Sequence, residues 1–175
     1  MIRISMQTVL AAIAVAVLFV TAVQAEEMDM IVKLGFDRVA DEYTCEGMDV
    51  SPSIEIQGLN ATSMAVIVDD PDAPSATFTH WLIWNIPPTD AIPRAIAKKG
   101  TLKEPFSALQ GTNDFGEIGY AGPCPPSGKP HRYFFRVFGL DRMLNLSAGA
   151  TVADLQKAMQ GHVLQKGEAV ATYGR

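Results

Sequence analysis

Two nearly continuous apolar runs, residues 63–68 and 81–86, restrict the fold more than any other feature of the sequence. Each run has the length of a β-strand, and a strand without polar alternation is typical of one covered on both faces. The segment between the runs contains Pro71 and Pro74, which lack a backbone N–H and cannot extend a hydrogen-bonded ladder. The pattern therefore predicts two buried strands joined by a rigid turn.

Further strands are expected in two alternating segments, residues 30–36 and 53–58, and in the strand-like segments 132–140 and 168–173. One helix is expected after Thr151, a favourable N-cap residue that Asp154 follows three positions later. Many strands and one late helix predict a mainly β fold, a β-sandwich with one or two short peripheral helices.

The first 25 residues have the order of a secretory signal peptide. Arg3 precedes the apolar run 9–20, and the small residues Val23 and Ala25 stand where a signal peptidase would cleave. The apolar run is shorter than the ~20 residues that span a bilayer, although an uncleaved anchor remains the alternative. We therefore expect residues 26–175 to form one periplasmic or secreted domain with no stable membrane anchoring after cleavage.

Charge and cysteine content narrow the partners further. Without Arg3, residues 26–175 carry 13 Lys and Arg against 19 Asp and Glu, a net charge of −6. This balance argues against nucleic acid as a partner and against membrane binding through a basic patch, so an anion site would have to be built locally. The two cysteines, Cys45 and Cys124, predict one disulfide in an exported chain, with two unpaired thiols as the alternative.

The chemistry-bearing residues cluster in two loops. Asp70 and Asp72 lie in the Pro-containing turn that leads to His80, and His131 follows a second loop rich in Gly and Pro. Both histidines open apolar strands. If these strands run side by side, the imidazoles meet in one pocket with the acids at its mouth, and a carboxylate partner favours a protonated imidazole that binds anions.

The same residues also have simpler structural interpretations. The acids are also compatible with an exposed turn, and each histidine with an ordinary strand-end position. We interpret the third histidine, His162, as structural or as part of the rim.

Several motifs in this order resemble the phosphatidylethanolamine-binding protein family, also called the Raf kinase inhibitor protein family, and especially its bacterial YbhB/YbcL branch. The resemblance covers residues 29–175. The motifs that carry it are Asp49-Val-Ser-Pro52, Asp70-Pro-Asp-Ala-Pro74, His80-Trp81, Gly122-Pro-Cys-Pro-Pro126, His131-Arg-Tyr133 and Ala171-Thr-Tyr-Gly-Arg175.

The resemblance implies a β-sandwich with one small pocket for phosphate, acetate or a phosphorylated head group, without a metal or cofactor. Matching motif to motif, the side chains that line this pocket are Asp70, Asp72, His80, His131 and Tyr133. Gly122 is expected to offer its backbone to the ligand, and Pro74 and Trp81 to shape the wall. The resemblance also implies that a Cys45–Cys124 bridge would lie beside the pocket.

Two departures limit what can be carried over. The segment between Pro74 and His80 is short, which predicts a more open mouth, and no long C-terminal helix like that of animal members is expected. We do not transfer roles in animal kinase signalling.

The leading hypothesis is an exported, non-catalytic protein that binds small anions. The alternatives are a hydrolase that uses the Asp/His pocket, with or without Zn²⁺ held by the two acids and two histidines, and an inhibitor of a protease or another partner protein. A homodimer also remains open.

Overall fold

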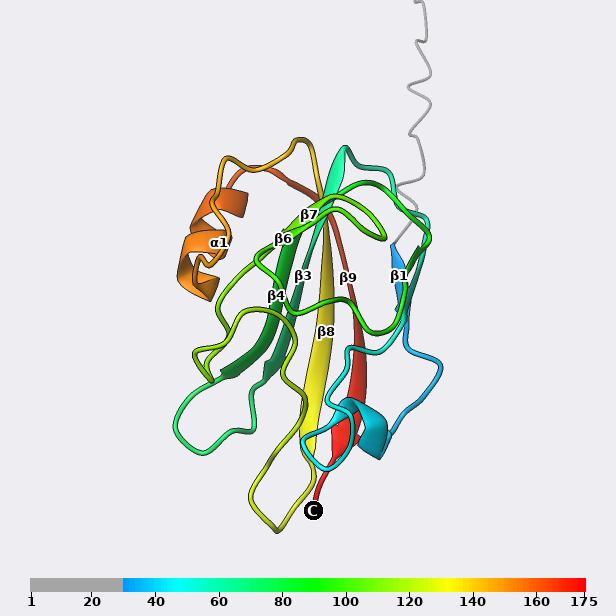
Figure 1. Ribbon diagram of the computed structural model, residues 1–175. Helices are drawn as coiled ribbons and strands as arrows, with labels where there is room; N and C mark the ends of the chain where they lie inside the picture. The colour runs from blue at the N-terminus through cyan, green and yellow to red at the C-terminus, as the bar shows by residue number, and fades with distance from the viewer. Residues whose placement is uncertain (1–29) are drawn as a thin grey trace, which may run out of the picture.

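The computed structural model describes residues 30–175, which form two facing β-sheets with one α-helix at the side (Figure 1). The predicted signal peptide lies outside the described residues. The large sheet is antiparallel throughout and has six strands, in the order β6 (Thr101–Leu102), β7 (Ala108–Gln110), β4 (Phe78–Ile86), β3 (Ser63–Asp70), β8 (His131–Leu140) and β9 (Val163–Tyr173). The small antiparallel sheet consists of β1 (Ile31–Lys33), β2 (Ile54–Gln57) and β5 (Ala91–Ile92).

The predicted mainly β sandwich is confirmed, and the two apolar runs lie at its centre. Every residue of β3 is buried, because alternate side chains face two different apolar clusters. Val66 and Val68 face the core between the sheets, where they meet residues such as Ile54 of β2. Ala65 and Ile67 face the opposite side, which α1 (Val152–Met159) covers.

The predicted helix begins where its cap residue places it. The Thr151 side chain accepts a hydrogen bond from the Asp154 N–H, and the Asp154 carboxylate accepts one from the Thr151 N–H. This reciprocal capping satisfies two N–H groups that a helix otherwise leaves free. Leu155 and Met159 are buried beneath the helix, and Gly161 adopts a positive φ of 76° just beyond its end.

Several strand boundaries differ from those predicted. β3 runs two residues further, to Asp70, and β4 begins three residues earlier, at Phe78. β1 ends at Lys33 rather than near residue 36, and Gly35 two residues later has a φ of 73°, outside the range of a strand. β9 begins at Val163, well before residue 168, because its first half pairs with the end of β8. Its first two side chains are both exposed, so no alternation marked this stretch as a strand.

Two further features complete the fold. A short 3₁₀ turn, η1 (Asp41–Tyr43), crosses one end of the sandwich. Within residues 30–175, no helix combines the length and apolar character that crossing a bilayer would require.

Candidate functional site

A cavity of about 170 Å³ opens at the end of the large sheet where β3 ends and β4 and β8 begin. Four polar side chains line it: Asp70, His80, His131 and Tyr133. Its remaining wall is built from small, aromatic and proline residues and one half-cystine, namely Ala73, Pro74, Phe78, Phe115, Cys124, Pro125 and Pro126. His80 and His131, which lie 51 positions apart in the sequence, are therefore brought to one cavity together with Asp70, Tyr133 and Pro74.

A β-bulge turns His80 toward this cavity. Val68 pairs with Trp81 and Asp69 pairs with Thr79, so His80 has no partner in the β3–β4 ladder. In a regular strand, His80 and Trp81 would point to opposite faces. The extra residue allows both side chains to face the layer between the sheets, and bulges commonly re-aim a side chain in this way.

His80 is buried and hydrogen-bonded. Its Nδ1 lies 2.7 Å from the carbonyl oxygen of Ala121, which can only accept, so Nδ1 carries the proton. Burial lowers the pKa of His80, and the Ala121 carbonyl and the Asp70 charge oppose that shift only in part. His80 is therefore a neutral imidazole at neutral pH with Nε2 as an acceptor. Its hydrogen-bond partner is a carbonyl rather than the carboxylate that the sequence analysis expected beside a protonated imidazole.

His131 is the imidazole that has a carboxylate partner. Its Nδ1 lies 2.7 Å from Oδ2 of Asp70, and both side chains are largely shielded from solvent. Asp70 is itself held by its turn, because its Oδ1 accepts the N–H of Asp72. The predicted rigid turn is thus present, and it fixes the carboxylate that orients His131.

Tyr133 places an unpaired hydroxyl at the cavity. The side chain is almost fully buried, and its Oη makes no hydrogen bond of normal geometry within residues 30–175, although the Asp70 carboxylate lies near it. Burial raises the pKa of Tyr133 well above its ordinary value, and the nearby Asp70 charge raises it further. The hydroxyl therefore keeps its proton and remains a donor.

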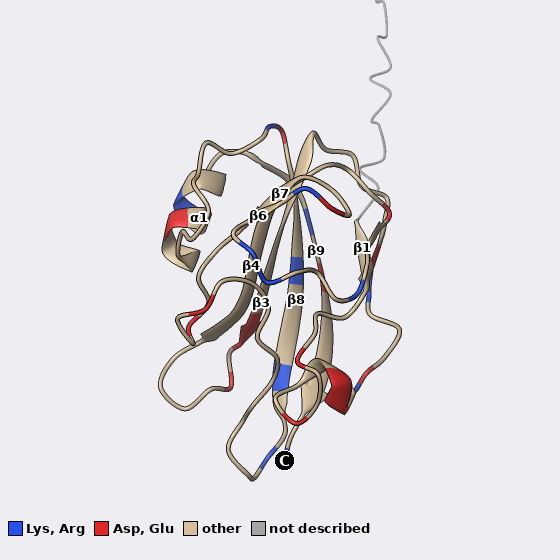
Figure 2. Cartoon of the chain, viewed as in Figure 1, with Lys and Arg blue, Asp and Glu red and all other residues tan. Residues whose placement is uncertain are grey.

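Asp72 does not line the cavity. Its carboxylate forms a two-pronged ion pair with the Arg132 guanidinium, at 2.7 and 2.9 Å, and also accepts the Arg132 N–H. Figure 2 shows that basic segments of β8 and the acidic end of β3 belong to neighbouring strands of the large sheet. The bonds from Arg132 hold the pKa of Asp72 well below its ordinary value. Its charge is therefore matched on the rim instead of adding to the pocket.

Two other predicted residues have structural contacts instead of lining the cavity. Trp81 is fully buried in the core, where its Nε1 donates to Gln110 Oε1. Gly122 donates its N–H to Asp49 Oδ1 at 2.6 Å, so this N–H is already engaged. A Cβ at Gly122 would lie 2.1 Å from the carbonyl oxygen of Tyr43, which explains why this position needs glycine.

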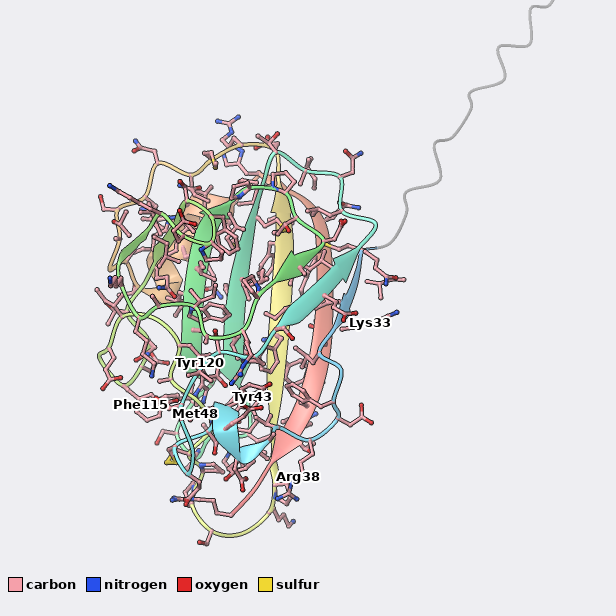
Figure 3. The ribbon with its side chains drawn as sticks, turned by 45° about the vertical axis from the view of Figure 1, so that its right-hand side comes forward. Lys33, Arg38, Tyr43, Met48, Phe115 and Tyr120 are labelled. Carbon is pink, nitrogen blue, oxygen red and sulfur yellow. A yellow bond between two sulfur atoms is a disulfide. The ribbon has the colours of Figure 1, made fainter. Side chains whose placement is uncertain are left out.

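Phe115 is the main residue that the sequence analysis missed. The buried Asn113 side chain accepts the N–H groups of Phe115 and Glu117 and donates to the Gly119 carbonyl, which fixes a tight loop. The loop places the half-exposed Phe115 ring at the pocket end of the molecule, 4.6 Å from the Phe78 ring (Figure 3). Asn113 and Gly116 signal a turn in the sequence, but nothing there indicates which strand the turn approaches.

The predicted disulfide joins Cys45 to Cys124, with a Cα–Cα distance of 5.4 Å, and Cys124 lines the cavity. The disulfide links the loop after η1 to the pocket wall.

His162 lies away from the pocket, 3.1 Å from Asp141 at the other end of β8. Within the described part of the chain, no three His, Cys, Asp or Glu side chains lie together as metal ligands.

Comparisons with known proteins agree on one family. Residues 33–174 match the family profile described as phosphatidylethanolamine-binding protein. A UPF0098 protein of Pyrococcus abyssi is 56% identical over 137 residues, which is 77% of each chain. Among solved structures, Escherichia coli YbcL, described as a member of the mammalian PEBP family, matches with a TM-score of 0.77 and 30% identity over 84% of this chain and 99% of its own. A PEBP homologue from Chlamydia trachomatis matches with a TM-score of 0.75 and 31% identity over 84% of this chain and 98% of its own. This chain belongs to the phosphatidylethanolamine-binding protein family.

Proposed function

We propose that this protein binds a small anion, inorganic phosphate or a phosphorylated head group, in the cavity between Asp70, His80, His131 and Tyr133, and that it does so outside the cytoplasm without chemical turnover. The observation that carries the proposal is the buried Tyr133 hydroxyl, which lies at a cavity and makes no hydrogen bond of normal geometry within residues 30–175. A buried donor left unpaired costs about 1–3 kcal/mol. A ligand oxygen that accepts from this hydroxyl would recover that free energy.

The charges around the cavity support an anion in spite of the acidic composition. Arg132 neutralises Asp72 on the rim. The Asp70 carboxylate is engaged by the His131 Nδ1 at 2.7 Å, so it does not face the cavity as an unpartnered acid. The His131 Nε2 makes no hydrogen bond in the described chain and is therefore available to a ligand.

His80 favours an anion that itself carries a proton. Its neutral imidazole uses Nδ1–H on the Ala121 carbonyl and leaves Nε2 as an acceptor. Hydrogen phosphate and phosphate monoesters can donate to Nε2 and accept from Tyr133 at the same time. Sulfate has a similar shape but no proton near neutral pH, so we expect it to bind more weakly.

The size and chemistry of the walls support head-group binding without covalent catalysis. Pockets for drug-sized ligands measure roughly 300–1,000 Å³, whereas this cavity has about 170 Å³. It therefore fits phosphate or phosphorylethanolamine rather than acyl chains. Among residues 30–175, no Ser or Thr lines it, and the Cys124 sulfur is held in the disulfide, so this part of the chain offers the wall no free Ser, Thr or Cys nucleophile.

Isothermal titration tests the proposal with phosphate, phosphorylethanolamine, sulfate and acetate. We expect saturable binding of the two phosphate compounds and about tenfold weaker binding by Tyr133→Phe, which removes only the unpaired hydroxyl. Tyr43→Phe is the matched control, because its side chain does not line this cavity. Absence of saturable heat, or equal affinity of wild type and Tyr133→Phe, would contradict the binding site.

Two further measurements test the rest of the proposal. Hydrolysis of phosphate esters by the wild-type protein, lost in His80→Ala, would contradict a non-catalytic role. Export predicts that protein recovered from the extracytoplasmic fraction has the mass of residues 26–175 with an oxidised disulfide.

A further inference from the structure

Arg175 lies outside the cavity but contacts both loops that the disulfide joins. Its Nε donates to the Pro125 carbonyl oxygen at 2.7 Å, and its Nη1 lies 3.1 Å from Glu46 Oε1. Glu46 directly follows Cys45, and Pro125 directly follows Cys124. The guanidinium therefore forms a non-covalent bridge next to the covalent one.

The pocket wall needs such external bonds because of its composition. Pro123, Pro125 and Pro126 have no N–H, so this stretch has few donors with which to hold itself in place. The stretch is held instead by hydrogen bonds that its carbonyl oxygens accept. The Pro123 oxygen accepts the Cys45 N–H at 3.2 Å, and the Pro125 oxygen accepts from Arg175.

We propose that Arg175 is a positioning residue for the ligand pocket, whose guanidinium holds the Pro125 carbonyl and the Glu46 carboxylate together and so fixes the wall formed by Cys124, Pro125 and Pro126. The proposal rests on the anion-binding function argued above. Arg175 does not itself line the cavity, and its Nε and Nη1 are engaged by Pro125 and Glu46. A lysine would not replace it, because a single ammonium lacks the planar fork that reaches two acceptors in fixed directions.

The test measures two properties of the full-length purified protein: phosphate affinity by calorimetry and the rate at which dithiothreitol reduces the disulfide under native conditions. The second readout does not depend on the ligand. We expect Arg175→Ala to bind phosphate about tenfold more weakly, the loss typical of a charge-assisted hydrogen bond, and to be reduced several-fold faster. Arg175→Lys should resemble Arg175→Ala, and Glu46→Gln, which keeps the bond to Pro125, should lie between them and wild type.

Arg142→Ala is the matched control, because Arg142 is an exposed arginine paired with Asp141 beyond the far end of β8. It should behave as wild type in both measurements. If the disulfide becomes accessible by local opening of the wall, its reduction rate should hardly change in low concentrations of urea. If it becomes accessible by global unfolding, the reduction rate should increase steeply with urea.

The outcomes separate this proposal from the proposed function. If wild type fails to bind phosphate, the proposed function fails, and the positioning role then stands or falls on the reduction rate alone. An Arg175→Ala reduction rate equal to that of wild type, or a rate that rises steeply with urea, overturns the positioning role. So does full restoration by Arg175→Lys.

Discussion

The two ends of the large sheet are held together by different kinds of contact. One is the pocket end, and the other, called the α1 end, is the end where β8 stops at Leu140 and α1 packs on the outer face. At the α1 end, the capping bonds join Thr151 and Asp154, which are three residues apart. At the pocket end, the Asp70–His131 pair spans 61 residues, the Arg175–Pro125 bond spans 50 and the disulfide spans 79. The helix cap is local, but the α1 end also contains long-range bonds, since Asn85–Leu144 spans 59 residues and Ser63–Arg142 spans 79. The ends therefore differ mainly in the kind of link: apolar packing and neutral hydrogen bonds at the first, covalent and ionic cross-links at the second.

This difference explains why the cavity lies where it does. The α1 end closes its apolar face with Leu155 and Met159, which leave no polar group to satisfy. At the pocket end, irregular loops carry the walls, and specific cross-links replace regular hydrogen-bonded structure. Loops held by a rigid scaffold are the usual place for binding residues.

The largest expected effect follows from removing the covalent cross-link. The Cys45→Ser/Cys124→Ser double variant frees a loop of 79 residues in sequence separation, and the chain-entropy account predicts a loss of about 4 kcal/mol in the free energy of unfolding. We also expect weaker phosphate binding, because Cys124 lines the cavity. Urea denaturation and calorimetry measure the two effects.

A loss of both stability and phosphate affinity in the same variant is the result that would connect the disulfide to the pocket. If the double variant is destabilised but binds phosphate as tightly as wild type, the pocket end does not depend on its cross-link, and the contrast between the two ends is wrong.

The second effect concerns the α1 end alone. Leu155 is fully buried between α1 and the sheet, so Leu155→Ala should cost about 3 kcal/mol of stability through lost contacts and the cavity that remains. We expect its phosphate affinity to match that of wild type while the protein is folded, since distant sites usually act independently. A matching loss of affinity would show that the two ends are coupled through the sheet.

The sequence predicted the α1 end better than the pocket end for the same physical reason. Apolar runs and a capping residue are local signals, and they located β3, β4 and the start of the helix, although β3 and β4 extend further toward their turn than predicted. The start of β9 was missed because exposed Val163 and Leu164 break the alternation, and only pairing with β8 makes this stretch a strand.

The pocket was predictable only as a set of residues. The motifs indicated Asp70, His80, His131 and Tyr133, which the structure brings to one cavity. They could not indicate the partners of these residues, because hydrogen bonds and burial between distant segments leave no spacing in the sequence. Arg132 therefore takes Asp72 out of the pocket, and the core takes Trp81.

The smallest expected effect compares the histidines at the two ends as the pH falls. Burial lowers the pKa of His80 in the folded state, whereas the unfolded chain has the ordinary value of about 6.5. Below pH 6.5 the unfolded state therefore takes up a proton that folded His80 does not, so the free energy of unfolding falls as the pH falls toward the folded pKa. The contribution is fully present above pH 6.5, and its loss cannot exceed about 1.4 kcal/mol per pH unit.

His80→Asn keeps a donor for the Ala121 carbonyl but does not titrate, so urea denaturation at pH 7.5 and 5.5 should show a smaller loss of stability for this variant than for wild type. His162→Asn, at the α1 end, is the control, because it removes a histidine outside the pocket. It should retain the part of the pH-dependent loss of stability that comes from His80. If instead His80→Asn and wild type lose the same stability, His80 is not the neutral, buried imidazole on which the proposed phosphate selectivity depends.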